Sequence, residues 1–208
     1  MKLTIKYIIT SLSIYSLLLA GDEARIGTSG ANQLLVPVGA RGVAMSGSDL
    51  VYSHGLESAY WNPAGLSRLE GATVLASQMK MFGDVGVSFF GAGSKLGSTG
   101  SVGLTIKSLD LGDIPVTTVE AMDGTGNTFK PNMTTLALTY ANAFSDKARL
   151  GISVKAITES IPRASASAFA LDAGVQYENL NDIEGLGIGL VLKNIGTDMH
   201  YEGSGLTT

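Results

Sequence analysis

The fold is decided by the stretch Phe169-Ala170-Leu171-Asp172-Ala173-Gly174-Val175-Gln176-Tyr177-Glu178. Large apolar residues alternate through it with small or polar ones, and a period of two is the period of a β-strand whose faces differ. One face carries Phe169, Leu171, Ala173, Val175 and Tyr177, and the other carries Ala170, Asp172, Gly174, Gln176 and Glu178. The stretch therefore predicts a strand with one apolar face and one small or polar face.

The same alternation recurs along the chain after Gly71, between turns rich in Gly, Asp, Asn and Ser. Clear examples are residues 102–107, 135–141, 149–156 and 186–193, and a weaker strand is expected over Thr73 to Lys80. In residues 85–90 we assign Val85, Val87 and Phe89 to the apolar face and Phe90 to the polar one. The long connection from Asp110 to Pro131 leaves room for one short strand around Val116 to Val119. The sequence thus predicts roughly eight strands.

Alternation fits a soluble β-sandwich as well as a membrane β-barrel. The strand length of about ten residues matches a tilted bilayer crossing. Phe169 and Tyr177 stand at the two ends of one apolar face, where aromatic girdles lie in membrane barrels. The opposite face carries Lys155, Asp172 and Lys193, which a sandwich core would not hold. We therefore predict an all-β fold, a transmembrane antiparallel β-barrel with lipid outside and a polar lumen, and the sandwich is the alternative.

Composition excludes several classes of protein. Charged residues make up 15% of the chain, against about 25% in ordinary soluble domains. No apolar run of the length of a membrane helix follows the first twenty residues. The absence of Cys excludes disulfide scaffolds and thiol catalysis. With 14 Lys and Arg against 18 Asp and Glu, the chain has no basic footprint for nucleic acid.

Residues 1–20 are predicted to be a signal peptide. Lys2 and Lys6 form a short positive region, and the mostly apolar stretch from Tyr7 to Ala20 ends in small residues. Cleavage is expected after Ala20, and a buried N-terminal helix is the alternative. The protein is thus expected to be exported.

Residues 21–70 are irregular and rich in small residues, and we expect only short helices there. Asn62 is suited to cap a helix, Pro63 to its first position, and Gly65 to limit it to a turn or two. The predicted organisation is residues 1–20 as signal peptide, 21–70 as an N-terminal segment, and 71–208 as strands of an incomplete barrel.

Several stretches resemble the PorV/PorQ family of outer-membrane proteins. They are residues 27–30, 34–48, 57–66, 192–196 and 199–203, and the Asn-Pro-Ala-Gly-Leu run at 62–66 is also shared with FadL-type barrels. The family-motif residues, carried over as a structural signature, are Gly39, Arg41, Gly42, Met45, Gly47, Tyr60, Trp61, Asn62, Pro63, Ala64, Gly65 and Leu66.

The resemblance implies a FadL-like barrel of about fourteen strands when complete, with residues 21–70 folded into the lumen as a plug. Because the chain stops at Gly203-Ser204-Gly205-Leu206-Thr207-Thr208, in what resembles a loop, we expect it to be C-terminally truncated. The implied location is the bacterial outer membrane, with membrane lipid as one partner. The implied function is a non-catalytic accessory in type IX-like secretion that docks secreted protein cargo and contacts other secretion components. A FadL-like channel for hydrophobic small molecules is the alternative, and a structural surface protein is the third possibility.

Motifs of catalysis and of cofactor binding are missing from the sequence. It has no Gly-x-Ser-x-Gly elbow, no His-Glu-x-x-His and no phosphate-binding loop. Gly185, Gly187 and Gly189 are interpreted as small residues that face a crowded lumen, rather than as a dinucleotide site. Residues 123–127 are interpreted as an exposed turn rather than a calcium loop, and His54 as a surface or plug histidine. We predict no enzyme activity, no cofactor and no metal.

Overall fold

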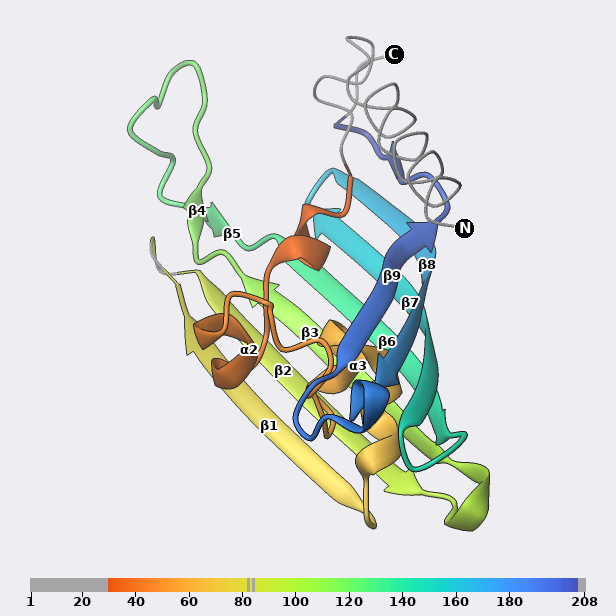
Figure 1. Cartoon of the computed structure of the whole chain (residues 1–208). Coiled ribbons are helices and arrows are strands. Elements are labelled where there is room, and N and C mark those ends of the chain that lie inside the picture. Colours follow the sequence, from red (N-terminus) through yellow and green to blue (C-terminus); the bar gives the residue numbers. More distant parts are fainter. Residues whose placement is uncertain (1–29, 82, 84, 206–208) are drawn as a thin grey trace, which may run out of the picture. The chain divides into compact units, whose positions relative to one another are not determined.

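The computed structural model describes residues 30–81, 83 and 85–205 (Figure 1). Residues from Ala31 onward form one compact unit. The predicted signal peptide, residues 1–20, lies outside the described residues. In the described part of the chain, no helix is long and apolar enough to cross a membrane.

One antiparallel sheet of eight strands dominates this unit. Its strands are β1 (Thr73–Lys80), β2 (Gly86–Lys95), β3 (Ser101–Asp110), β6 (Asn132–Ala143), β7 (Ala148–Ile161), β8 (Ala164–Tyr177), β9 (Ile188–Gly196) and β10 (His200–Glu202). Neighbours follow the chain from β1 to β8, and both β9 and β10 then pair with β8. Over the described ranges the sheet stays open, with β1 at one edge and β9 and β10 at the other. The predicted all-β class and strand number are therefore confirmed, and a closed barrel is not seen.

The connection between β3 and β6 carries a separate two-stranded ribbon. Its strands are β4 (Ile114–Pro115) and β5 (Thr128–Phe129), which project away from the sheet (Figure 1). The short strand predicted over Val116 to Val119 is thus wrong in position. Pairing ends soon after Val116, whose N–H donates to the carbonyl of Asn127 at 2.8 Å, because residues beyond it turn back on themselves.

Residues 31–70, here called the N-terminal segment, contain four short helices as predicted. These are η2 (Asn32–Leu35), α2 (Ala40–Ala44), α3 (Ser58–Trp61) and η3 (Pro63–Arg68). The Asn62 side chain accepts a hydrogen bond from the Ala64 N–H at 3.2 Å, and Pro63 fills the first helical position. The expected capping chemistry is therefore confirmed. The segment lies against one side of the sheet, which we call the inner face; the other side is the outer face.

The two faces of the sheet have opposite character. In β8, buried and exposed residues alternate without a break. The buried, inner positions hold Ala164, Ala166, Ala168, Ala170, Asp172, Gly174 and Gln176. The exposed, outer positions include Phe169, Leu171, Val175 and Tyr177. The predicted division of β8 into two faces is confirmed, and it is the apolar face that is open.

In β2 the predicted faces are reversed. Val87 and Phe89 are buried on the inner face, whereas the Phe90 side chain is 52% exposed on the outer face. The physical reason is the partner that the inner face meets there. Val87 and Phe89 pack with Val38 of the N-terminal segment and with Leu109 of β3 in one apolar cluster.

Apolar side chains cover the outer face as a band across six strands. They are Phe90, Leu104, Ile106, Leu136, Leu138, Tyr140, Leu150, Ile152, Val154, Phe169, Leu171, Val175, Tyr177, Ile188, Leu190 and Leu192. The strand register aligns them in rows, one of which comprises Phe90, Ile106, Leu136, Ala156 and Phe169. From β2 to β8 the neighbouring row consists of hydroxyl residues: Ser88, Ser108, Thr134, Thr158 and Ser167. The outer band thus has a sharp polar margin, which we call the hydroxyl row.

Candidate functional site

Asn62 fixes the N-terminal segment to the sheet. Its side chain is fully buried, and its Nδ2 donates to the carbonyls of Leu50 at 2.9 Å and of Val175 in β8 at 3.0 Å. Gly174 lies directly beneath it, because a Cβ at that position would stand 2.0 Å from Asn62 Oδ1. A single polar side chain therefore ties three separate stretches of backbone together.

Other glycines of the strands also make room for the N-terminal segment. A Cβ at Gly151 in β7 would lie 2.3 Å from the carbonyl carbon of Pro63. A Cβ at Gly189 in β9 would lie 2.7 Å from the backbone of Leu50 and of Val51. Gly93 in β2 and Gly103 in β3 face the side chains of Leu56 and Leu66.

Gly187 and Gly189 accordingly face the inner side, as the sequence interpretation expected, since an added Cβ at Gly187 would meet the Val51 side chain at 2.6 Å. Gly185 differs, because it occupies the preceding turn with φ +79° and has open space around it.

Tyr60 and Trp61 hold the segment in shape. Trp61 Nε1 donates to the Val38 carbonyl at 2.9 Å, and the Tyr60 hydroxyl donates to the Leu34 carbonyl at 3.2 Å. Added Cβ atoms at Gly42 and Gly47 would stand 2.2 and 3.0 Å from the Trp61 ring. Because Tyr60 is partly buried, desolvation raises its pKa to about 12, and the negative charge of Asp172 adds to the rise.

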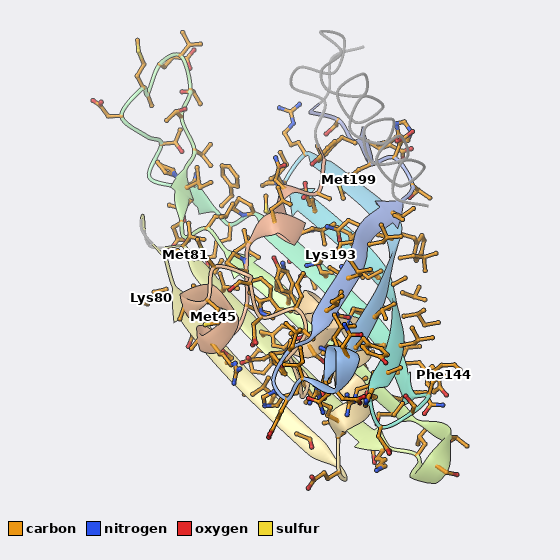
Figure 2. All side chains as sticks on the ribbon, viewed as in Figure 1. Met45, Lys80, Met81, Phe144, Lys193 and Met199 are labelled. Atoms are coloured by element: carbon orange, nitrogen blue, oxygen red, sulfur yellow. The ribbon has the colours of Figure 1, made fainter. Side chains whose placement is uncertain are left out.

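Three lysines of the inner face gather around Tyr60. Lys193 Nζ of β9 lies 3.8 Å from the centroid of the Tyr60 ring, and Figure 2 shows this side chain on the inner side of β9. Lys107 Nζ of β3 lies 4.8 Å from the same centroid and donates to the carbonyls of Gln33 and Val36 at 2.7 and 2.9 Å. Lys155 of β7 forms an ion pair with Asp172 of β8.

A β-bulge between β8 and β9 completes this cluster. The register shifts between Leu171 and Ala173, so that two residues of β9 stand opposite Asp172. Asn194 adopts φ 60°, donates its N–H to Asp172 Oδ1 at 2.8 Å, and accepts from Lys155 Nζ at 2.9 Å. The bulge therefore connects the Lys155 and Asp172 pair to a third strand.

A cavity of about 20 Å³ lies beside Tyr60 within this cluster. It is lined by Leu34, Ala59, Tyr60, Phe89, Thr105, Lys107, Thr135, Ala137 and Lys155. A volume of this size accommodates one water-sized particle. The inner face thus offers a small charged cavity, whereas an enclosed small-molecule pocket measures ~300–1,000 Å³.

The family-motif residues come together, with one exception. Gly39, Gly42, Gly47 and residues 60–66 all pack within the N-terminal segment or against the inner face. Arg41 forms an ion pair with Asp49 at 2.8 Å, and this pair borders a second cavity of about 70 Å³. Met45 takes no part, since its side chain is 47% exposed.

The other sequence interpretations concern His54 and residues 123–127. His54 is exposed on the N-terminal segment, and its Nδ1 is hydrogen-bonded to the Tyr52 carbonyl oxygen at 2.9 Å. Residues 123–127 form a largely exposed part of the β4–β5 connection. Among the described residues, no three His, Asp or Glu side chains are grouped to hold a metal ion.

Sequence reasoning placed Lys155, Asp172, Gln176 and Lys193 on the polar face but did not single out Lys107, Asn194 or Thr135. Lys107 and Thr135 had a usable signal, because each stands on the polar side of an alternating strand. Asn194 had no such signal, because the alternation of apolar and polar residues does not reveal where a β-bulge occurs.

Comparison with known proteins gives no relative. No protein-family model, no curated protein and no solved structure matches this chain.

Proposed function

We propose that this chain forms wall strands and the plug of a bacterial outer-membrane β-barrel of PorV/PorQ type, as a non-catalytic accessory in type IX-like protein secretion. One observation carries the proposal: the exposed face of the sheet is apolar, whereas small and polar residues line most of the covered face. A soluble sheet has the opposite arrangement, with its apolar face covered and its polar face in water. A sheet surrounded by lipid has the arrangement seen here.

The dimensions of the outer band support the same proposal. From Phe169 to Tyr177 the band extends about 27 Å along β8 at ~3.4 Å per residue. At the tilt of about 35–45° of barrel strands this length corresponds to a height of about 19–22 Å, close to the apolar bands of outer-membrane barrels, which are about 25 Å tall. Aromatic residues stand near both margins, with Phe90 and Phe169 in the row beside the hydroxyl row and Tyr177 at the opposite end. Four charged groups within the length of the band, Lys107, Lys155, Asp172 and Lys193, are turned to the inner face.

In this proposal the open edges of the sheet are joined by further strands, to about fourteen as in FadL-like barrels. A bilayer supplies no water to the unpaired N–H and C=O groups of an edge strand, so a lipid-embedded sheet has to close. The N-terminal segment then occupies the lumen. Its hydrogen bonds to Lys107 and Gln176 run from strand side chains to carbonyls of the segment, so the polar lumen wall itself holds the plug.

The alternative function, a channel for hydrophobic small molecules, requires an enclosed apolar pocket beside the plug. The cavity beside Tyr60 is about 20 Å³ and is bordered by two lysines. It is therefore too small and too charged for such a ligand. This contrast favours cargo docking, in which binding takes place on loops.

The β4–β5 connection is the part best suited to dock cargo. It belongs to the connection between β3 and β6, the longest between strands of the eight-stranded sheet, and long loops of such barrels are extracellular whereas short turns are periplasmic. Two apolar side chains near its tip are almost fully exposed, Val119 at 85% and Met122 at 79%. Exposed apolar groups on a projecting loop are typical of protein contacts.

The first test is the migration of the native protein from the outer-membrane fraction, boiled against unboiled. A heat-dependent shift with a boiled mass well above 21.5 kDa is expected for a closed barrel that is longer than this chain. A heat shift at a boiled mass near 21.5 kDa contradicts the PorV/PorQ assignment. A soluble protein without a shift contradicts the membrane location.

The second test concerns secretion. Deletion of the gene is expected to abolish secreted products, and the double variant Val119→Ser and Met122→Ser to reduce them while the heat shift remains. Ile183→Ser is the matched control, because Ile183 is exposed in the turn at the opposite end of the sheet. Normal secretion after deletion, together with lost uptake of an apolar tracer, supports the channel instead.

A further inference from the structure

The cavity beside Tyr60 combines buried positive charge with a hydroxyl group that has no partner. Lys107 and Lys155 line it, and each is only 4% exposed. Thr135 also lines it, is 6% exposed, and its Oγ1 has no hydrogen-bond partner. Leaving a buried hydroxyl without a partner is unfavourable, so native structures rarely do so.

Positive charge exceeds negative charge around this cavity. Lys107, Lys155 and Lys193 converge on Tyr60, whereas Asp172 is the carboxylate that the structure pairs with this cluster. Glu159, the next carboxylate on β7, receives a hydrogen bond from the Tyr201 hydroxyl instead. Buried charge without a counter-charge is strongly unfavourable, and the cluster therefore lacks negative charge.

The ammonium groups retain donors for a further ligand. An ammonium group has three N–H donors. Lys107 uses two of them on the carbonyls of Gln33 and Val36. Lys155 donates one to Asn194 Oδ1 at 2.9 Å and forms an ion pair with Asp172. One donor on each lysine and the Thr135 hydroxyl are thus available at the cavity.

We propose that the cavity beside Tyr60 binds one small inorganic anion of the size of chloride, held by Lys107, Lys155 and Thr135. The cavity volume of about 20 Å³ suits a water-sized particle and excludes a tetrahedral oxyanion. A water molecule satisfies Thr135 but leaves the excess positive charge. A monatomic anion satisfies both. This inference does not depend on the proposed secretion function, because it uses only contacts within the unit that begins at Ala31.

The test is a chloride titration of the purified native protein at constant ionic strength, with gluconate replacing chloride. A ligand that binds only the folded state raises the unfolding temperature with its concentration, so chloride is expected to raise it and sulfate is not. The fluorescence of Trp61, the single tryptophan of the chain, follows unfolding.

Two matched variants make the test specific. Thr135→Val removes the cavity hydroxyl while it keeps the side-chain shape. The loss of one charge-assisted hydrogen bond is expected to raise the chloride concentration for half of the effect by about tenfold or more. Ser101→Ala removes a buried hydroxyl of β3 that also lacks a partner but does not line the cavity, and should keep the wild-type response.

Diffraction from crystals soaked in bromide provides the direct measurement, with an anomalous peak expected between Lys107, Lys155 and Thr135. The proposal is overturned if chloride and gluconate give the same unfolding temperature. It is equally overturned if Thr135→Val responds to chloride as the wild type does, or if bromide gives no peak in the cavity.

Discussion

The two faces of β8 differ more than those of any ordinary surface strand. Seven inner positions hold only alanine, glycine, aspartate and glutamine, and they are buried. The seven outer positions are exposed, and they hold two serines and an alanine besides phenylalanine, leucine, valine and tyrosine. Small inner residues leave space for another part of the same chain, whereas large outer residues present a continuous apolar surface. Burial of a position in this sheet is thus decided by its closeness to the N-terminal segment and not by its hydrophobicity.

The largest loss of stability is expected from a large side chain on the inner face, where the N-terminal segment packs. Gly174→Leu places atoms where Asn62 now lies, because even a Cβ there would be 2.0 Å from Asn62 Oδ1. We expect a loss of at least about 3 kcal/mol in the free energy of unfolding, from overpacking and from the lost hydrogen bonds of Asn62. Denaturant unfolding monitored by Trp61 fluorescence measures it.

The neighbouring outer position is the control for this variant. Ala173→Leu places the same side chain on the exposed face, one residue away, and is expected to leave the unfolding midpoint nearly unchanged. Equal losses in the two variants would show that the faces do not differ in packing.

A charge on the outer face gives the second largest effect. Ile152 is 56% exposed and pairs with Ala173, the middle position between Phe169 and Tyr177. Ile152→Arg in lipid bilayers is expected to cost about 2–4 kcal/mol, as for Arg at the midplane of a barrel wall. Ser165→Arg, which lies beyond the hydroxyl row on the same face, should cost only about 0–1 kcal/mol. If both variants unfold like the wild type in bilayers, the outer band does not contact lipid.

The smallest expected effect is the pH dependence of stability that Tyr60 of the N-terminal segment causes. The pKa of Tyr60 is raised to about 12, whereas that of an unfolded tyrosine is ~10. Between these values the folded chain binds more protons than the unfolded one, so this contribution to stability is complete below pH ~10 and is lost as the pH rises towards 12.

Tyr60→Phe supplies the comparison for the pH effect. Unfolding midpoints of wild type and variant, measured from pH 9 to 12, are expected to converge at the alkaline end, since other titrating groups are common to both. A constant difference across this range would contradict the role of Tyr60 burial.

Most of the eight-stranded sheet could be predicted from the sequence. The strand expected from Thr73 to Lys80 coincides with β1, and the faces of β8 were assigned correctly. Both follow from local alternation, which needs no knowledge of partners. The predicted faces of β2 were the reverse of the observed ones, because Val87 and Phe89 pack against Val38 of the N-terminal segment. Apolar residues are favourable on the inner face where the segment itself is apolar.

The candidate site was predicted only in part. Residues 60–66 were identified through capping chemistry and a family resemblance, and they do lie at the centre of the contact with the sheet. Their partners were not predictable, because most of the bonds join side chains to backbone carbonyls. Every residue has a backbone carbonyl, so the sequence does not indicate that the Gln33 carbonyl accepts a hydrogen bond from Lys107.

The contacts of Asn62 also have a consequence for the order of folding. Its carbonyl partners Val175 and Leu190 are 113 and 128 positions further along the chain. The N-terminal segment is synthesised before either partner, yet it has no place to bind until β8 and β9 have paired. Loop closure over such distances is slow. Seating of this segment is therefore a late event, and Trp61 fluorescence is expected to change after strand pairing is complete.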